Sequence, residues 1–99
     1  MVRPAIHPGE HLAKELHELD MSALPLAKEL GIPANRVTEI LRGRRGISAN
    51  TALRLARWMG TTPQFWMNLQ RNYELRLAEQ EHGDQIRREV RRRTDHEAA

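Results

Sequence analysis

A run of polar side chains followed by arginines, in the middle of the chain, has the chemistry needed to recognise nucleic acid. Methyl, amide, hydroxyl, carboxylate and guanidinium groups can all read base edges in the major groove. The candidates for base contacts are Ala34, Asn35, Arg36, Thr38 and Glu39. Guanidinium groups and the polar start of a helix bind phosphate. The candidates for phosphate contacts are Arg42, Arg44, Arg45, Ser48 and Asn50.

Other chemistries find less support in the sequence. The chain has no cysteine, which excludes thiolate zinc sites and a thiol nucleophile. His7 and His11 have the four-residue spacing of metal ligands, but no third ligand is nearby, so we expect no metal ion or other cofactor. Ser22 and Ser48 each precede a predicted helix and are explained as caps. Since glycine-rich phosphate loops and paired carboxylates are also missing, we expect no catalytic residues and no enzymatic activity.

Two apolar patterns on either side of a glycine predict the scaffold that presents the polar side chains. The first pattern falls on one face of a helix and comprises Leu26, Ala27 and Leu30. The second comprises Val37, Ile40 and Leu41. Gly31 permits a left-handed turn between the two helices, and Pro33 suits the first turn of the second. A helix-turn-helix over residues 23 to 42 is therefore expected. Two packed helices without a ligand are the alternative, which the polar residues disfavour.

Three further helices are expected, and no strand-like alternation is present, so the predicted fold class is all-α. The helix before the helix-turn-helix spans about residues 8 to 20, with the core candidates Leu12, Ala13, Leu16 and Leu19. Another follows Ser48 and stops at Gly60. The last is capped by Thr61 or Thr62 and begins with Pro63. We expect Gly83 to break this last helix.

The distribution of charge favours a polyanionic partner. The net charge of the 99 residues is +3. Residues 21 to 60 hold seven of the arginines and lysines against two acids, whereas residues 1 to 20 are net acidic. Positive charge thus concentrates on the predicted helix-turn-helix, as phosphate attraction requires. No stretch approaches the roughly 20 apolar residues of a membrane span, so a cytoplasmic protein without membrane contact is expected.

The chain is long enough for one small domain, which we place at residues 1–79. Residues 80–99 are a charged C-terminal extension with few apolar anchors, either partly helical or disordered. The apolar stripe of the last helix is too long for so small a core to cover. The part of it that we assign to a dimer interface comprises Trp66, Leu69, Tyr73 and Leu77. Trp58 and Phe65 are assigned to the core of the monomer.

Three segments, in this order, carry a family resemblance: HPGEHL, ELGIPANRVTEILRGRRGIS and TALRLARWMGTTPQFWMNLQRNYEL. Over residues 6 to 77 the chain resembles the HigA (VapI) antitoxins, which are lambda-repressor-like (Cro/C1-type, XRE) helix-turn-helix proteins. The resemblance implies a five-helix domain that forms a homodimer on a palindromic operator and represses its own operon. It also implies a partner, a HigB-type (RelE-like) toxin that cleaves mRNA. Pro33 departs from the serine or threonine often found at that position in the family.

A basic toxin needs an acidic or shape-matched surface, and the first helix offers one. The candidates for toxin contact are Glu10, Glu15, Glu18 and Asp20. The arginine-rich C-terminal tail and the N-terminal arm, residues 1 to 6, are competing sites. Two other functions stay open: a solitary phage-like or metabolic regulator without a toxin, and a protein-interaction module that uses Trp58, Phe65 and Trp66.

Overall fold

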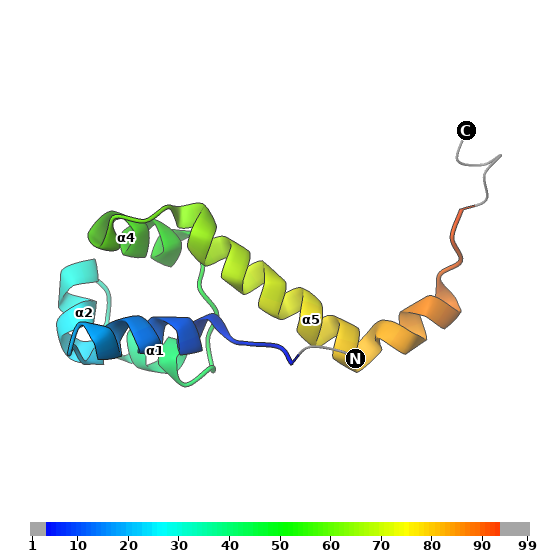
Figure 1. Ribbon diagram of the computed structural model, residues 1–99, viewed down its shortest axis with the longest axis horizontal. Helices are drawn as coiled ribbons and strands as arrows, with labels where there is room; N and C mark the ends of the chain where they lie inside the picture. Colours follow the sequence, from blue (N-terminus) through cyan, green and yellow to red (C-terminus); the bar gives the residue numbers. More distant parts are fainter. Residues whose placement is uncertain (1–3, 94–99) are drawn as a thin grey trace.

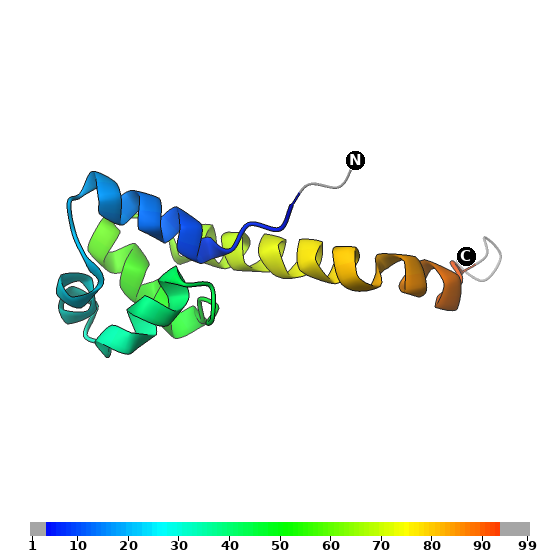
Figure 2. The ribbon, with the colours of Figure 1, turned by 90° about the horizontal axis from the view of Figure 1, so that it is seen from below.

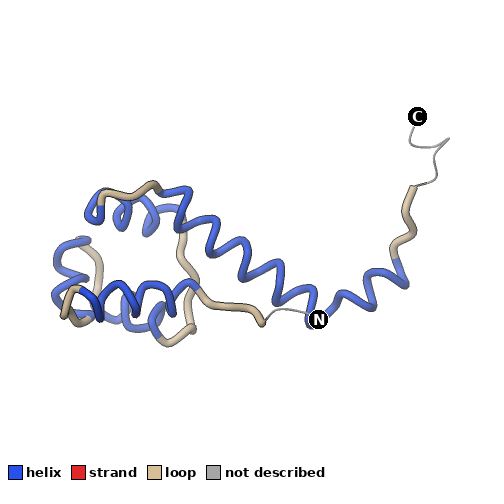
Figure 3. The backbone as a smooth tube through the Cα atoms, in the orientation of Figure 1, coloured by secondary structure: helices blue, strands red, loops and turns tan. Residues whose placement is uncertain are grey.

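The computed structural model describes residues 4–93, and in this part of the chain five helices are joined by loops without any strand (Figure 1). The helices are α1 (Pro8–Glu18), α2 (Ala23–Leu30), α3 (Ala34–Leu41), α4 (Ala49–Met59) and α5 (Pro63–Glu89). The tube in Figure 3 follows the same helices and the short loops between them. The prediction of an all-α, five-helix fold is confirmed.

The predicted helix-turn-helix consists of α2 and α3. Gly31 ends α2 with φ of 71°, in the left-handed region that a side chain would disfavour. The Ile32 amide donates to the Ala27 carbonyl at 3.1 Å, which closes the turn. Pro33 is the N-cap of α3, one position before the first turn, with φ of −62° and extended ψ. Since its side chain accepts no hydrogen bond, α3 begins without a capping side chain.

The core lies where α1, α2, α3 and α4 meet the first turns of α5. Its buried hydrophobic residues are Leu12, Leu16, Leu26, Ala27, Leu30, Val37, Ile40, Ile47, Ala52, Leu55 and Trp66. Figure 2 shows the blue α1 along one side of the body and the blue-green α3 along the other, with α5 extending away from both. A Cβ atom at Gly9 would collide with the Ile40 carbonyl oxygen, so a glycine is needed where α1 crosses α3. The recognition face of α3 is thus supported from behind by α1.

Two of the three predicted caps form their hydrogen bonds. Ser48 Oγ accepts from the Thr51 amide at 3.3 Å, and Thr62 Oγ1 accepts from the Phe65 amide at 3.2 Å. Ser22 occupies the N-cap position of α2, but its hydroxyl makes no capping hydrogen bond. The first helix ends at Glu18, two residues earlier than expected, and Asp20 adopts a positive φ of 51° in the following turn.

Several expectations about burial are wrong. Leu19 is expected in the core but is 53% exposed, because it caps the end of α1 rather than continuing its inner face. Ala13 is exposed as well. Phe65, also expected in the core, is 38% exposed, whereas Trp66 is fully buried with its Nε1 donating to Thr61 Oγ1 at 3.2 Å.

The last helix continues through Gly83, contrary to the expected break. Figure 1 shows α5 leaving the body of the protein and changing direction in its yellow-to-orange part. The Glu79 and Arg87 side chains pair at 2.7 Å across Gly83, which has no side chain to separate them. Asp84 also pairs with Arg87 at 2.7 Å. A glycine inside a helix costs only about 1 kcal/mol relative to alanine, so the surrounding helix formers and ion pairs carry α5 past it.

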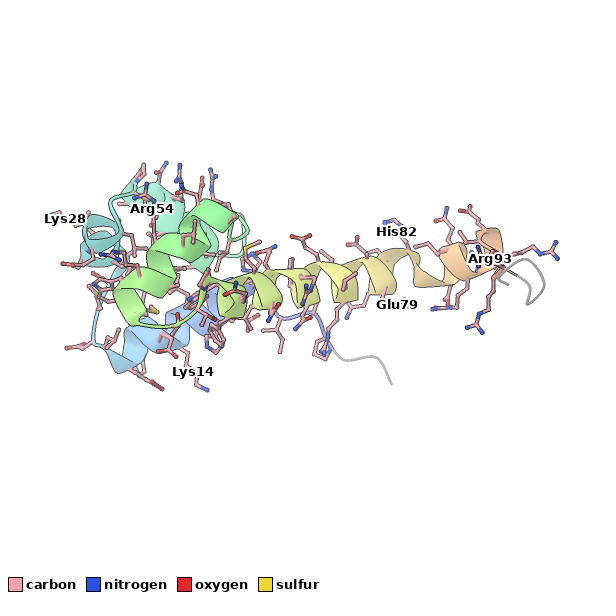
Figure 4. The ribbon with its side chains drawn as sticks, turned by 90° about the horizontal axis from the view of Figure 1, so that it is seen from above. Lys14, Lys28, Arg54, Glu79, His82 and Arg93 are labelled. Carbon is pink, nitrogen blue, oxygen red and sulfur yellow. The ribbon has the colours of Figure 1, made fainter. Side chains whose placement is uncertain are left out.

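The projecting half of α5 makes the molecule long, with principal extents of 56 × 26 × 22 Å. Its radius of gyration, 17.4 Å, exceeds the value of about 13 Å expected for a compact chain of this size. In Figure 4, Glu79, His82 and Arg93 lie along this half, away from the body that carries Lys14, Lys28 and Arg54. None of the helices described is long and apolar enough to span a bilayer. Residues 1–3 of the predicted arm and 94–99 of the predicted extension lie outside the described residues.

Candidate nucleic-acid interface

The polar face of α3 points away from the core, but its residues differ in how freely they can reach a ligand. Asn35 is exposed, and Arg36 is half-buried. Thr38 is half-buried and its hydroxyl donates to the Ala34 carbonyl at 3.1 Å, which leaves its methyl group and oxygen lone pairs for a partner. Ala34 is half-buried and packs against the core. Asn35 is therefore the base-contact candidate with the most accessible side chain.

The loop after α3 is held in one conformation by the end of that helix. We call residues 42–46 the arginine loop. The amides of Arg44 and Arg45 both donate to the Glu39 carbonyl, at 2.8 and 3.3 Å, and the Gly43 amide donates to the Ile40 carbonyl at 3.0 Å. Gly43 has φ of 75°. These bonds satisfy the carbonyls at the helix end and leave Arg42, Arg44 and Arg45 exposed side by side.

Two of the candidate residues pair with each other. Arg45 Nε donates to Glu39 Oε1 at 2.8 Å, and both side chains stay partly exposed, at 51% and 40%. The carboxylate on the recognition face is thus neutralised by one of the loop arginines. An unpaired carboxylate would repel the DNA phosphates, but the negative charge of Glu39 is balanced by Arg45, so Glu39 is compatible with a position at the DNA surface.

The start of α4 supplies the remaining polar candidates. Ser48 and Asn50 are exposed near the arginine loop, but each already has a partner within the chain. Ser48 caps α4, and Asn50 Oδ1 accepts from Arg54 Nε at 2.8 Å. Arg54 Nη1 in turn donates to the Leu30 carbonyl at 2.8 Å, so it joins α4 to the turn between α2 and α3. Asn50 consequently helps to orient Arg54, in addition to the phosphate contact predicted for it.

Three residues that support this surface are not identified from the sequence as part of it: His7, Gln70 and Arg54. The buried Gln70 Oε1 accepts from the Ile47 amide at 2.7 Å and its Nε2 donates to Glu74 at 2.7 Å, which ties the loop before α4 to α5. Gln70 and Arg54 bond to backbone that is distant in the sequence, and the His7 ring lies against the equally distant Gly43. A periodicity pattern carries no signal for such contacts.

The apolar stripe of α5 is smaller than the predicted interface. Trp66 is fully buried in the monomer, so, contrary to the prediction, it offers no surface to a second subunit. Leu69, Tyr73 and Leu77 are half-buried, and we call these three residues the α5 stripe. Leu69 and Tyr73 line a hollow of about 290 Å³ together with the exposed Ile6.

The acidic residues of α1 lie beside an apolar hollow. We call Glu10, Glu15, Glu18 and Asp20 the acidic face; all but the half-buried Glu15 are exposed. A hollow of about 380 Å³ lies between the end of α1 and the joint of α4 and α5, lined by Glu15, Leu19, Trp58, Met59, Thr61, Phe65 and Trp66. The exposed Leu19 and Phe65 therefore give this surface an apolar centre next to negative charge. Among residues 4–93, no group of three or more histidines and acids is arranged to hold a metal ion.

Comparisons with known proteins agree on one family. Residues 12–66 match the family model HTH_3, described as helix-turn-helix. The chain is 51% identical to virulence-associated protein I of Dichelobacter nodosus over 79 residues, which are 79% of this chain and 73% of the relative. A solved structure of an addiction-module antidote protein of the HigA family from Coxiella burnetii has a TM-score of 0.91 and 55% identity, and covers 92% of this chain and 100% of its own. The Pseudomonas aeruginosa antitoxin HigA, solved with the higBA promoter, has a TM-score of 0.86 and 48% identity, with coverages of 88% and 96%.

Proposed function

The chain belongs to the helix-turn-helix family and, within it, to the HigA (VapI) antitoxins, and from that premise we propose that it binds a palindromic operator, represses its own operon and neutralises a HigB-type toxin. The observation that carries the DNA-binding part is the accessible polar face of α3 followed by three exposed arginines. The similar Pseudomonas antitoxin was solved with a promoter, which supports the same role here. We further propose that the protein has no enzymatic activity and is located in the cytoplasm.

In the proposed complex α3 lies in the major groove. Its first turn brings Asn35 to a base edge, and Thr38 and Glu39 follow one turn later on the same face. The arginine loop lies along the adjacent phosphates, where Arg42 and Arg44 bind without reading sequence. Arg45 holds Glu39 or a phosphate. Ser48 and Asn50, at the positive end of the α4 dipole, add neutral contacts.

Repression needs two such units, because one recognition helix reads too few base pairs to define a unique operator. We propose a twofold dimer through the α5 stripe, which places two copies of α3 in successive major grooves roughly 34 Å apart. Leu69, Tyr73 and Leu77 recur at intervals of four residues and so lie along one side of α5. Their partial exposure leaves apolar surface that a second copy would bury.

The toxin is proposed to dock on the acidic face and the apolar hollow beside it. A cationic nuclease surface would pair with Glu15, Glu18 and Asp20, and an apolar side chain would enter between Leu19 and Phe65. The hollow lies at the C-terminal end of α4, whereas the DNA-facing Ser48 is at its N-terminal end. An 11-residue helix separates the two sites by about 16 Å, so both partners have room to bind at once.

The experiment that tests the function has two parts. The chain is first mixed with a duplex from the promoter upstream of its own gene, and footprinting should show protection of a palindrome, with an affinity that decreases steeply with salt. The chain is then co-expressed with the neighbouring reading frame, and the two products should purify together and restore growth. Promoter binding without a stable complex would identify a solitary regulator. If the chain bound no duplex at any salt concentration, it would be a protein-interaction module instead.

The docking site is tested by reversing charge on α1. Glu15→Lys combined with Glu18→Lys should slow association with the neighbouring gene product, most strongly at low salt, and leave promoter affinity nearly unchanged. Glu81→Lys, at an exposed acid on the projecting half of α5, is the matched control. If the control variant slowed association equally, the contact would lie on α5 or the C-terminal tail rather than on α1.

A further inference from the structure

His7 is the one buried histidine among the described residues, and it lies where three elements meet. Its Nδ1 accepts from the Gly9 amide at 2.8 Å and so caps α1. Its ring packs edge-on against Tyr73 of α5, with centroids 4.9 Å apart. On its other side it lies against Gly43 of the arginine loop, where a Cβ atom would be 3.8 Å from the ring, and it lines a hollow with Arg42 and Gly43. One imidazole thus contacts α1, α5 and the arginine loop.

These contacts of His7 require its imidazole ring to be neutral. Because Nδ1 accepts a hydrogen bond, the neutral ring carries its proton on Nε2. Protonation would place a second N–H on Nδ1, facing the Gly9 N–H, and would abolish the cap. Desolvation by burial is the largest effect on the pKa of His7 and lowers it from 6.5, and the Arg45 backbone and Glu10 partly oppose this. The ring is therefore neutral at physiological pH.

The charged and titratable groups around the ring come from every neighbouring element. Glu10 lies on α1, and Arg42 and Arg45 lie in the arginine loop. Tyr73 and Arg76 lie on α5, and His11 lines the same hollow. The two arginines of the loop and Arg76 disfavour a further positive charge, whereas Glu10 favours it. The surroundings described here therefore offer no acid in hydrogen-bond contact that would hold a protonated ring in place.

We propose that the neutral His7 imidazole is a positioning residue for operator binding, which holds the arginine loop in its DNA-facing conformation and connects that loop to the α5 stripe through Tyr73. This inference rests on the proposed operator binding. The backbone bonds that hold the start of the loop run to carbonyls of α3, and the His7 ring, which lies against Gly43, joins the loop to α1 and to Tyr73 of α5. Protonation of the ring breaks the cap on α1 and displaces the ring that lies against Gly43, and the phosphate-binding arginines then no longer keep their fixed spacing.

The first test concerns the free protein and does not depend on DNA. The amide resonances of Gly43 and Gly46 are followed by NMR as the pH is lowered, together with the imidazole resonances of the five histidines. Both amides should shift with the same midpoint as the His7 ring, below 6.5. In His7→Asn they should not titrate. Asparagine is the closest replacement because it is a good helix cap but has no ring and no titration.

The second test uses the promoter duplex upstream of the chain's own gene. His7→Asn should bind roughly tenfold more weakly at low salt, with a salt slope smaller by about 0.9 for each phosphate that is no longer bound. Lowering the pH from about 7.5 to about 5.5 should weaken binding by the wild type but not by His7→Asn. This direction is diagnostic, since protonation of the other histidines adds positive charge and would strengthen attraction to DNA.

His17→Asn is the matched control, because it replaces an exposed histidine in the last turn of α1, at the end of the helix opposite to His7. It should keep the wild-type salt slope and pH profile. The inference would be overturned if the Gly43 and Gly46 amide resonances did not shift when the His7 ring is protonated. It would also be overturned if His7→Asn had the salt slope and pH profile of the wild type. A wild type that binds no promoter duplex would instead refute the proposed operator binding, so the two failures are distinguishable.

Discussion

The Glu39 carboxylate and the Arg45 guanidinium are held together at 2.8 Å, although the sequence predicts that one reads bases and the other binds phosphate. Glu39→Gln keeps an acceptor for Arg45 but removes the negative charge. We expect tighter binding to every duplex, by several-fold, and a weaker preference at one base pair. Fluorescence anisotropy with the operator and with point-substituted operators measures both the affinity and the base preference.

The same substitution should change the free energy of unfolding by less than about 0.5 kcal/mol, since exposed ion pairs contribute little. Arg45→Gln, which removes the other charge of the pair, is the reciprocal control and should weaken binding to all duplexes. Weaker rather than tighter binding by Glu39→Gln would mean that the carboxylate is needed to orient Arg45.

Asn35 is the exposed amide at the start of the recognition helix. Asn35→Ala should cost about 1 to 3 kcal/mol of operator binding and relax selectivity at one or two base pairs, because alanine cannot form a bidentate hydrogen bond with adenine. Selection from a randomised operator library reports the selectivity. Asn68→Ala, at an exposed amide on α5, should change neither quantity. An unchanged footprint for Asn35→Ala combined with Thr38→Ala would exclude α3 as the base-reading element.

Arg44 is expected to bind phosphate only. Arg44→Ala should weaken binding to all sequences alike and reduce the slope of log affinity against log salt by about 0.9 per protomer. Affinities measured over a range of salt concentrations give that slope. Arg57→Ala removes an exposed arginine at the far end of α4 and should leave the slope unchanged. A change of base preference at constant slope would assign Arg44 to a base instead.

The α5 stripe should hold the dimer together. Leu77→Glu places a charge at the half-buried end of the stripe, so sedimentation at tens of micromolar should show a monomer with greatly reduced operator affinity. Leu75→Glu is the matched control, since Leu75 is 63% exposed and points to another side of the same helix. A wild type that sediments as a monomer, or a Leu77→Glu dimer with intact affinity, would contradict the assignment.

Gln70 is expected to stabilise the loop that leads into α4. Gln70→Leu leaves the buried Ile47 amide without an acceptor, which should lower the free energy of unfolding by about 1 to 3 kcal/mol. Gln64→Leu makes the same replacement at an exposed position of α5 and should be nearly neutral in denaturant unfolding. Equal effects of the two leucine variants would show that the hydrogen bond is not the cause.

Sequence signals that act over a few residues were sufficient to predict most of the helices of this fold. The left-handed Gly31, the capping residues Ser48 and Thr62, and the spacing of apolar residues act within a few residues of sequence. They therefore located the helix-turn-helix, and with it the exposed polar face of α3. The same signals wrongly predicted a helix break at Gly83, because a single unfavourable residue inside a long run of helix formers is outweighed by its neighbours.

The tertiary structure alone decided which side chains face the core and which contacts hold the site. Phe65 and Trp66 are adjacent and differ by about 100° in direction, so only the angle at which α5 packs on α4 determines that Trp66 is buried. Gln70 lies 23 residues from the amide that it binds, and His7 lies still farther from Gly43 and Tyr73 in the sequence. The sequence determined the polar face that is presented to a ligand. The packing of distant helices decided how that face is held, because such contacts depend on the relative placement of whole elements and leave no periodic trace in the chain.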